Sequence, residues 1–241
     1  AMNNSRQIFS KTPGITVWEN DASGIQLGVA SRGLSPNRSW EFNVRMNGYD
    51  ITPDPMGYPE AYYTPPADAV AKIEILRGAS SLQYGPQFGG LLNYVTNKNL
   101  GSKPITVESS QTMGSYGMFN SFNAIGGKIK KFSYYAYMHH RGAQGWRENS
   151  QYRTQTGSVS MSYDFSKKWQ LTAAYTHMNY VSQQAGGLTD EQFATYPSRS
   201  SRARNWFSTP WNTANISLNF TTSAATRFTF KTFGIVAQRN S

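Results

Sequence analysis

The chain has 241 residues, of which 38% are hydrophobic, 14% aromatic and 15% charged, and its formal net charge is +10. This composition excludes an intrinsically disordered chain, and it argues against a helical bundle, which would need more Ala, Glu, Lys and Leu. The absence of cysteine excludes disulfides and thiolate metal sites. The longest uninterrupted apolar run, Tyr134 to Met138, is far shorter than the roughly 20 residues of a membrane-spanning helix.

Charge and proline divide the chain into two parts that meet near residues 97–103. The first 100 residues contain eight basic and eight acidic residues, so the whole net charge lies beyond them. Eight of the eleven prolines also precede residue 100. We therefore expect two domains, residues 1–100 and residues 101–241. The excess of basic charge in the second suits solubility, nucleic acid, an anionic membrane surface or an anionic ligand.

Glycine and proline punctuate the first part, which we expect to be a small mixed α/β domain. A helical turn is predicted at 67–70, directly after Pro65 and Pro66. The pattern then predicts a strand at 72–76, a short helix at 79–84 and a strand at 91–96. The residues alone assign no function to this domain.

The second part reads as a series of antiparallel strands. Apolar and polar residues alternate in 158–165, 169–176 and 214–220, so each segment is predicted to be a strand with one apolar and one polar face. Weaker candidates are 105–112, 116–125, 132–140 and 227–237. These are about seven strands of roughly 8 to 12 residues, similar to the 9 to 11 or so of a tilted membrane-spanning strand.

The connections between these strands alternate in length. Short turns at 126–131, 166–168 and 221–226 alternate with long connections at 141–153 and 181–212, as is typical of outer-membrane barrels. A soluble β-sandwich also has alternating strands and many aromatic residues, and it remains open at this point. Aromatic residues near the strand ends are candidates for interfacial girdles: Tyr116, Phe132, Trp169, Tyr180, Phe220 and Phe233.

Several stretches resemble TonB-dependent outer-membrane receptors. AVAKIEILRGASSLQYGPQFGGLLNYVTNK (69–98) and TPGITVWENDASGIQLGVASRG (12–33) resemble parts of the plug domain of that family. RMNGYDI (45–51) resembles its Leu-Asp-Gly element, with Asn47 where Asp is usual. GGLTDEQFATYPSRSSRARNWF (186–207) is similar to an extracellular loop of ferric-citrate receptors.

The resemblance implies a 22-stranded membrane β-barrel with an N-terminal mixed α/β plug, in the outer membrane of a Gram-negative bacterium. About seven strands cannot close such a barrel. We therefore expect the chain to be a fragment, most of the plug and the first third of the wall, that cannot transport alone.

The resemblance also implies the partners. They are a ferric chelate, most of all ferric citrate, outer-membrane lipid, and the inner-membrane TonB complex, which pulls on a short N-terminal box. No such box precedes Asn3, so that contact is expected to be missing. The iron would arrive already chelated, so neither a cofactor nor a protein metal site is expected.

Arg199, Arg202 and Arg204 lie close together in the last of these stretches, with no acidic residue between them. The rigid guanidinium fork pairs bidentately with carboxylates, so the three suit a ligand with several carboxylates, such as ferric citrate. The alternative is a solvated basic loop.

The resemblance indicates further ligand residues in the plug. Arg32 and Arg38 flank a turn-rich stretch that corresponds to the apex of the plug. Tyr58 and Glu60 match a loop that reaches the ligand in ferric-citrate receptors, although amides are more usual there. For Arg32, a structural ion pair is the alternative.

Glu74 and Arg77 are expected by resemblance to be structural, with Arg77 buried against a carboxylate of the barrel so that the pair locks the plug in place. Catalysis has no supporting constellation. His139 and His140 are neighbours on a predicted strand and so face opposite ways. No Gly-x-Ser-x-Gly elbow or carboxylate pair suggests an enzyme.

Two other functions remain. One is the same architecture with another siderophore or a vitamin as ligand. The other is a soluble basic β-protein that binds single-stranded nucleic acid, which should carry basic residues beside aromatic ones on its strand faces. Many basic residues fall instead in the expected turns: Lys128, Lys130, Lys131, Lys167 and Lys168. We therefore expect no nucleic-acid partner.

Overall fold

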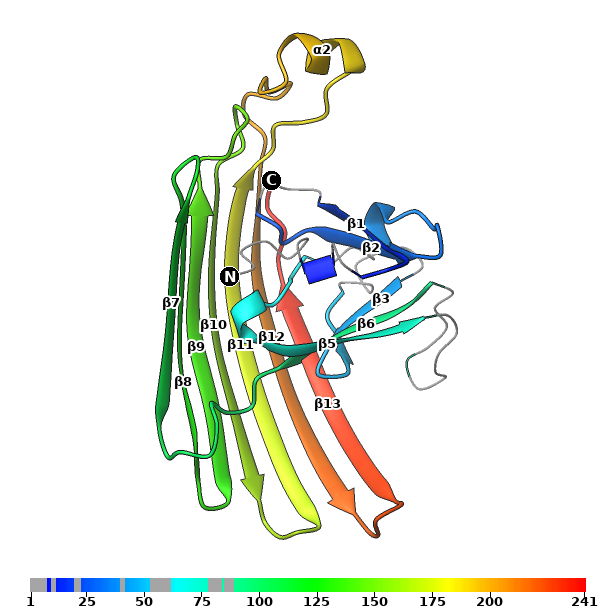
Figure 1. The fold of residues 1–241 in the computed structure, drawn as a ribbon, viewed down its shortest axis with the longest axis vertical. Coiled ribbons are helices and arrows are strands. Elements are labelled where there is room, and N and C mark those ends of the chain that lie inside the picture. Colours follow the sequence, from blue (N-terminus) through cyan, green and yellow to red (C-terminus); the bar gives the residue numbers. More distant parts are fainter. Residues whose placement is uncertain are drawn as a thin grey trace.

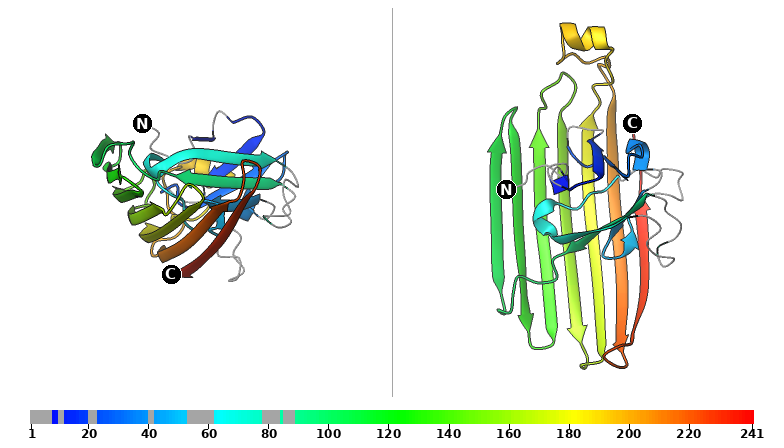
Figure 2. Two further views of the ribbon diagram at one scale, coloured as in Figure 1. Left: turned by 90° about the horizontal axis from the view of Figure 1, so that it is seen from below. Right: turned by 45° about the vertical axis from the view of Figure 1, so that its right-hand side comes forward.

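The computed structural model describes residues 8–9, 12–19, 23–39, 42–52, 62–77, 84 and 89–241. It consists of a tall, curved seven-stranded sheet with a smaller body on its concave side (Figures 1 and 2). We call the sheet, residues 106–237, the wall, and the described residues from 8 to 96 the plug. Among the described residues, no helix is long and apolar enough to cross a bilayer.

The described part of the plug is built mainly from two small sheets. Strands β1 and β2 form an antiparallel pair, and a four-stranded sheet has the order β4-β3-β6-β5, with β3 and β6 parallel. The bounds are β1 Ile15–Glu19, β2 Leu27–Ser31, β3 Phe42–Met46, β4 Tyr49–Asp50, β5 Val70–Arg77 and β6 Gly90–Thr96, with 3-10 turns η1 Asn37–Ser39 and η3 Ala67–Ala69. The turn predicted at 67–70 and the strands predicted at 72–76 and 91–96 are confirmed. The helix predicted at 79–84 lies outside the described residues except for Tyr84.

The β3–β4 turn shows why asparagine is suitable at position 47. Asn47 and Gly48 both have positive φ, 51° and 80°, the backbone that Asn-Gly adopts in a tight hairpin. The Asn47 side chain also accepts from the Thr96 amide at 3.1 Å and donates to the Thr96 hydroxyl at 2.9 Å. The residue that departs from the family pattern thus joins this turn to the end of β6.

Each strand of the wall pairs antiparallel with its neighbours in sequence, in the order β13-β12-β11-β10-β9-β8-β7. The seven expected strands are all present. Their bounds are β7 Thr106–Gly114, β8 Met118–Ile129, β9 Phe132–Ala143, β10 Tyr152–Asp164, β11 Trp169–Gln183, β12 Trp206–Thr221 and β13 Arg227–Ala237. Strands β7 and β13 form the two edges of the sheet.

Several strands are longer than expected, and the two long loops are correspondingly shorter. Strand β12 has 16 residues and pairs with β11 up to Gln183↔Trp206, so the loop between them covers only 184–205. In the lower half of β12 the apolar residues face away from the plug. In its upper half the aromatic residues Phe207 and Trp211 face the plug and are buried. The apolar residues of β12 therefore lie on one face in its lower half and on the opposite face in its upper half. For this reason the alternation seen in 214–220 did not predict the full length of the strand.

The apolar faces predicted for the strands lie on the convex side of the wall, away from the plug. Met161 is 48% exposed and Ile216 is 51% exposed, whereas their inward-facing neighbours Ser162 and Ser217 are buried. A sandwich would cover these apolar residues with a second sheet. No second sheet covers them among the described residues, so the sandwich alternative is wrong and the chain has a plug with a partial barrel wall.

Aromatic residues gather near the short turns of the wall, as the girdle prediction requires. Phe132, Trp169 and Phe220 face outward there, and the rings of Trp169 and Phe220 stack with centroids 4.1 Å apart. The prediction is wrong for Tyr180 and Phe233. Tyr180 is fully buried against the plug, and Phe233 stacks on Tyr49 of the plug.

Candidate ligand-binding site

The loop between β11 and β12, residues 184–205, rises above the wall and carries the short helix α2, Asp190–Thr195, at its tip (Figure 1). Thr189 caps the helix because its side chain accepts from the Gln192 amide, while the Gln192 side chain accepts from the Thr189 amide. All three expected arginines of this loop have exposed side chains.

Two residues of the neighbouring loop, 144–151, bind the backbone near these arginines. Arg147 donates to the Gly186 carbonyl at 2.8 Å and to the Arg199 carbonyl at 2.7 Å. Asn149 donates to the Arg202 carbonyl at 2.6 Å and to the Asn205 carbonyl at 3.1 Å. The backbone at residues 199 and 202 is therefore fixed.

Glu148, between these two residues, binds the same loop with its carboxylate. It accepts from the Tyr196 hydroxyl at 3.0 Å and from the Ser200 amide at 3.1 Å. These hydrogen bonds, with the Ser200 amide the larger cause, lower the pKa of Glu148 below its usual value. We call residues 147–149 the clamp. Sequence reasoning missed it because nothing local shows which backbone groups a loop side chain will reach.

The side chains of Arg199 and Arg202 are exposed and can meet a ligand. Neither guanidinium has a hydrogen bond or ion pair that the described structure records, but the charge of Arg199 also helps to lower the pKa of Glu148, and the Arg202 side chain lies beside Gly186. Arg204 lies elsewhere. Its side chain lines a pocket with Arg153 and Trp206 on the outer side of the wall.

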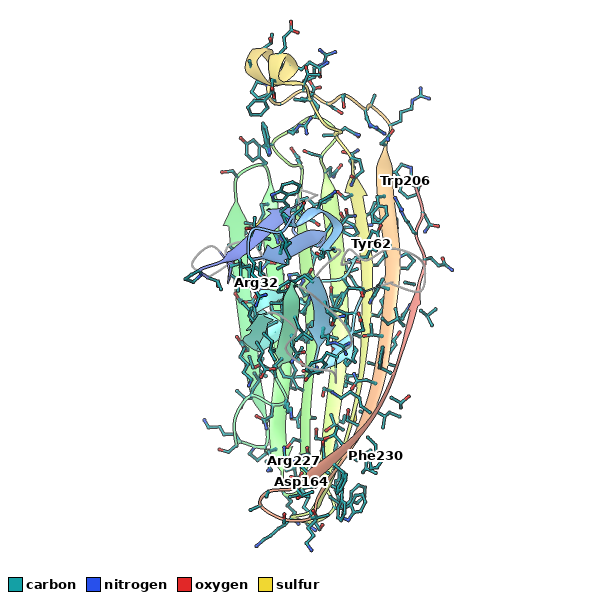
Figure 3. All side chains as sticks on the ribbon, turned by 90° about the vertical axis from the view of Figure 1, so that its right-hand side faces the viewer. Arg32, Tyr62, Asp164, Trp206, Arg227 and Phe230 are labelled. Atoms are coloured by element: carbon teal, nitrogen blue, oxygen red, sulfur yellow. The ribbon has the colours of Figure 1, made fainter. Side chains whose placement is uncertain are left out.

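The plug residues of the predicted site are only partly described. Arg32 is exposed in the turn after β2, with φ of 60°, and lies below the long loop (Figure 3). The described structure records no ion pair for Arg32, and both the ligand role and the structural alternative stay predictions. Arg38 belongs to η1, and its side chain lies outside the described part, as do Tyr58 and Glu60.

Glu74 and Arg77, the predicted lock between plug and barrel, both lie on β5. The Glu74 carboxylate accepts from the Asn93 side chain at 2.8 Å and pairs with Lys72 at 2.6 Å, two partners within the plug. Lys72, and then Asn93, lower the pKa of Glu74. The Arg77 side chain lies outside the described part, so its contact with the barrel stays a prediction.

The described contacts between plug and wall are largely aromatic. Tyr49 stacks on Phe233 and Tyr62 on Phe207, each with centroids 5.4 Å apart, and Figure 3 shows Tyr62 where the plug meets the upper wall. A third stack joins Tyr63 to the buried Trp211.

Two of these tyrosines also have polar contacts with the wall: Tyr49 with Thr213 and Asn215, and Tyr63 with Tyr137 and Thr176. Burial raises the pKa of Tyr49 to about 12, and the side chains of Thr213 and Asn215 offset part of that rise. The docking surface was not predicted, because it depends on which strand faces meet after folding.

The histidines are separated as expected. His139 is buried and its Nε2 lies 2.7 Å from the Asn120 side chain, while His140 is on the other face of β9. Within the part of the chain that the structure describes, no group of three or more His, Asp or Glu side chains could hold a metal ion.

Comparison with known proteins finds one matching family model and several similar structures. Residues 1–91 match the family model of the TonB-dependent Receptor Plug Domain. The structure resembles the unliganded ferric citrate transporter FecA with a TM-score of 0.80 and 21% identity, over 98% of this chain and 37% of that one. It also resembles the ferric yersiniabactin uptake receptor FyuA from Yersinia pestis, with a TM-score of 0.76 and 15% identity, over 97% and 38%.

A third similar structure is the siderophore receptor PirA from Acinetobacter baumannii, with a TM-score of 0.71 and 14% identity, over 99% of this chain and 38% of that one. The chain thus spans less than two fifths of the length of these three structures, and at such identities the likeness shows the fold. Residues 1–91 therefore match a TonB-dependent receptor plug domain, and the chain as a whole has the fold of that plug with the adjoining part of the barrel wall.

Proposed function

We propose that this chain supplies the plug and the first wall strands of an outer-membrane receptor that takes up a ferric chelate with energy from TonB. The observation that supports this most directly is the match to FecA, which extends through plug and wall together over 98% of the chain. The exposed apolar residues on the convex face suit contact with lipid in a Gram-negative outer membrane. The role is binding and transport rather than catalysis, and the iron is cargo rather than a resident cofactor.

Ferric citrate is the ligand that we propose. Arg199 and Arg202 lie on a loop whose backbone the clamp fixes, so two exposed guanidinium groups are presented with less loss of loop entropy on binding. An anionic chelate with several carboxylates would pair with these forks. In the plug, Arg32 lies below the loop and would extend the proposed site, and Arg38, Tyr58 and Glu60 stay predicted members of it. Arg204 is not part of it, because its side chain lines the outer pocket.

A receptor for another chelate is the second candidate. Similar folds occur in the ferripyoverdine receptor of Pseudomonas aeruginosa, with a TM-score of 0.68, and in the ferric-catecholate import receptor Fiu from E. coli, with a TM-score of 0.71. The shared wall and plug therefore do not select the ligand, and the loop side chains must.

The test is direct binding to the complete receptor in detergent, measured by titration calorimetry with ferric citrate and with a ferric catecholate. We expect ferric citrate to bind, and Arg199→Ala and Arg202→Ala each to weaken binding about tenfold or more, the value of a charge-assisted hydrogen bond. Lys167→Ala, in a short turn at the opposite end of the wall, is the matched control. Binding of the catecholate alone would favour the second candidate, and binding of neither would contradict the proposal.

A further inference from the structure

The upper outer face of the wall has a pocket of about 400 Å³ that the proposed chelate site does not use. Arg153 of β10, Gln183 of β11 and Trp206 of β12 line it, and Arg204 reaches it from the end of the long loop. Side chains alternate along a strand, so Arg153 faces the same way as the exposed Met161 of its own strand. The pocket therefore opens on the side of the wall opposite the plug.

The lining of the pocket is cationic and rich in donors. Arg153 and Arg204 are both exposed, and within the described part of the chain neither guanidinium has a hydrogen bond or an ion pair. The residues that line the pocket include no Asp or Glu. The side-chain oxygen of Gln183 accepts a hydrogen bond from the backbone amide of Gln151 at 3.1 Å. The side-chain NH₂ group of Gln183 therefore remains available as a donor. Such a site suits an anion with several oxygen atoms.

Its height on the wall indicates where that anion comes from. On β11 the outward residues are apolar or aromatic from Trp169 to Tyr175 and become polar at His177 and Asn179. Gln183 lies 14 residues above the girdle residue Trp169 on β11, or about 46 Å along the strand at ~3.3 Å per residue and about 35 Å in height for a strand tilted by ~40°. If an apolar band about 25 Å tall begins at Trp169, the pocket lies about 10 Å above its upper edge, on the headgroup side. Trp206, 44% exposed, has the amphipathic ring typical of the headgroup layer.

The pocket is also complete within this chain. It lies across β10, β11 and β12, which have paired neighbours on both sides, while the edges of the sheet are β7 and β13. The hydrogen bonds from Asn149 to the Gln184 and Asn205 carbonyls hold the two loops together at its rim.

We propose that this pocket binds a phosphate group of an outer-leaflet lipid headgroup through Arg153 and Arg204. The two guanidinium forks pair with phosphate oxygens, the glutamine amide donates to the headgroup, and Trp206 contacts its less polar part. The inference rests on the wall spanning a membrane and not on the identity of the chelate.

The test uses the complete receptor in detergent and native mass spectrometry with three probes. They are diphosphoryl lipid A, the same lipid with both phosphates removed, and inorganic phosphate. The wild-type receptor should bind diphosphoryl lipid A at least tenfold more tightly than either of the other probes. Equal binding of the dephosphorylated lipid would overturn the role of phosphate, and equal binding of inorganic phosphate would overturn the lipid as its source. Neither comparison depends on a variant.

Single substitutions then test whether Arg153 and Arg204 bind the lipid phosphate. Arg153→Ala and Arg204→Ala should each weaken binding of diphosphoryl lipid A by about tenfold, as expected for loss of a charge-assisted hydrogen bond. Arg199→Ala removes an exposed arginine of the same loop outside the pocket and should leave lipid binding unchanged. An equal loss in all three variants would show a diffuse charge effect and overturn the site. An unchanged far-UV circular dichroism spectrum and thermal midpoint of the Arg153→Ala receptor serve as the folding check.

Discussion

Glu148 joins two loops through a carboxylate that accepts one hydrogen bond on each oxygen, and these bonds favour its ionised form. Its pKa in the folded protein is below its usual value, so the stabilisation is fully present above the usual carboxyl pKa and is lost as the pH falls through the lowered value. We expect the Ser200 amide to be protected from hydrogen exchange at neutral pH and to lose that protection in acid.

The control for this prediction is Glu148→Gln, whose side chain does not ionise. After correction for intrinsic exchange, its protection at Ser200 should be lower than in the wild type at neutral pH and nearly independent of pH. A wild-type profile as flat as that of the variant would contradict the assigned role of the carboxylate.

Among the described residues, Trp211 is the largest fully buried side chain, and it packs on Tyr63 of the plug. Trp211→Ala should reduce the stability of the docked plug by about 3–5 kcal/mol, because a large buried aromatic group is lost and a cavity remains. The measurement is the denaturant midpoint for loss of the plug, followed with a probe on the plug. Trp146→Ala, in a loop where the ring is 47% exposed, should change that midpoint little. Equal effects of the two changes would contradict the aromatic docking surface.

At the scale of elements, the clamp makes the loop 184–205 depend on its neighbour 144–151. Arg147→Ala removes two hydrogen bonds from a charged donor to backbone carbonyls, each worth about 1.5–3 kcal/mol. We expect faster hydrogen exchange across residues 184–205 and weaker chelate binding, because the arginine loop is no longer held in place.

Arg199→Ala is the matched control for the clamp, since it removes a guanidinium of the loop but keeps the carbonyl that Arg147 binds. It should weaken chelate binding without changing exchange in the loop. Unchanged exchange in Arg147→Ala would mean that the loop is held by other contacts.

The strands show how much of the fold the alternation of apolar and polar residues can predict. Simple alternation located all seven strands of the wall, and β13 begins and ends where it was expected. It failed in the upper part of β12, where Phe207 and Trp211 face the plug while Ser208 and Pro210 face outward. In the proposed membrane setting, the upper part of the sheet separates the plug from lipid headgroups, whereas the lower part separates the lumen from hydrocarbon. A strand that crosses two environments changes which face is apolar, and only the docked structure shows where.

The candidate site was predictable only as a set of residue types. The spacing of Arg199, Arg202 and Arg204 indicated an anionic partner, but it did not show that Arg204 would line a different pocket from the others. That division depends on the path of the loop, which long-range hydrogen bonds from Arg147 and Asn149 determine.

At the scale of the whole molecule, one curved sheet separates three environments. The plug lies on its concave face (Figures 1 and 2) and is held there through aromatic contacts. Its lower convex face is apolar, and its upper rim carries the arginine loop and the cationic pocket. Both proposals require the convex face to meet lipid. If that face met water instead, the apolar rows would be an unexplained exposed patch.

The most direct test labels neighbouring residues of β11 with a spin probe in the complete receptor, reconstituted in lipid vesicles. The chain has no cysteine, so the single substitutions Leu171→Cys, Thr172→Cys, Ala173→Cys and Ala174→Cys each add one labelling site to it. Labels at 171 and 173 should be relaxed by oxygen dissolved in the bilayer, and labels at 172 and 174 should be shielded from it, in strict alternation. A water-soluble relaxation agent that reached positions 171 and 173 as readily as oxygen would contradict the account.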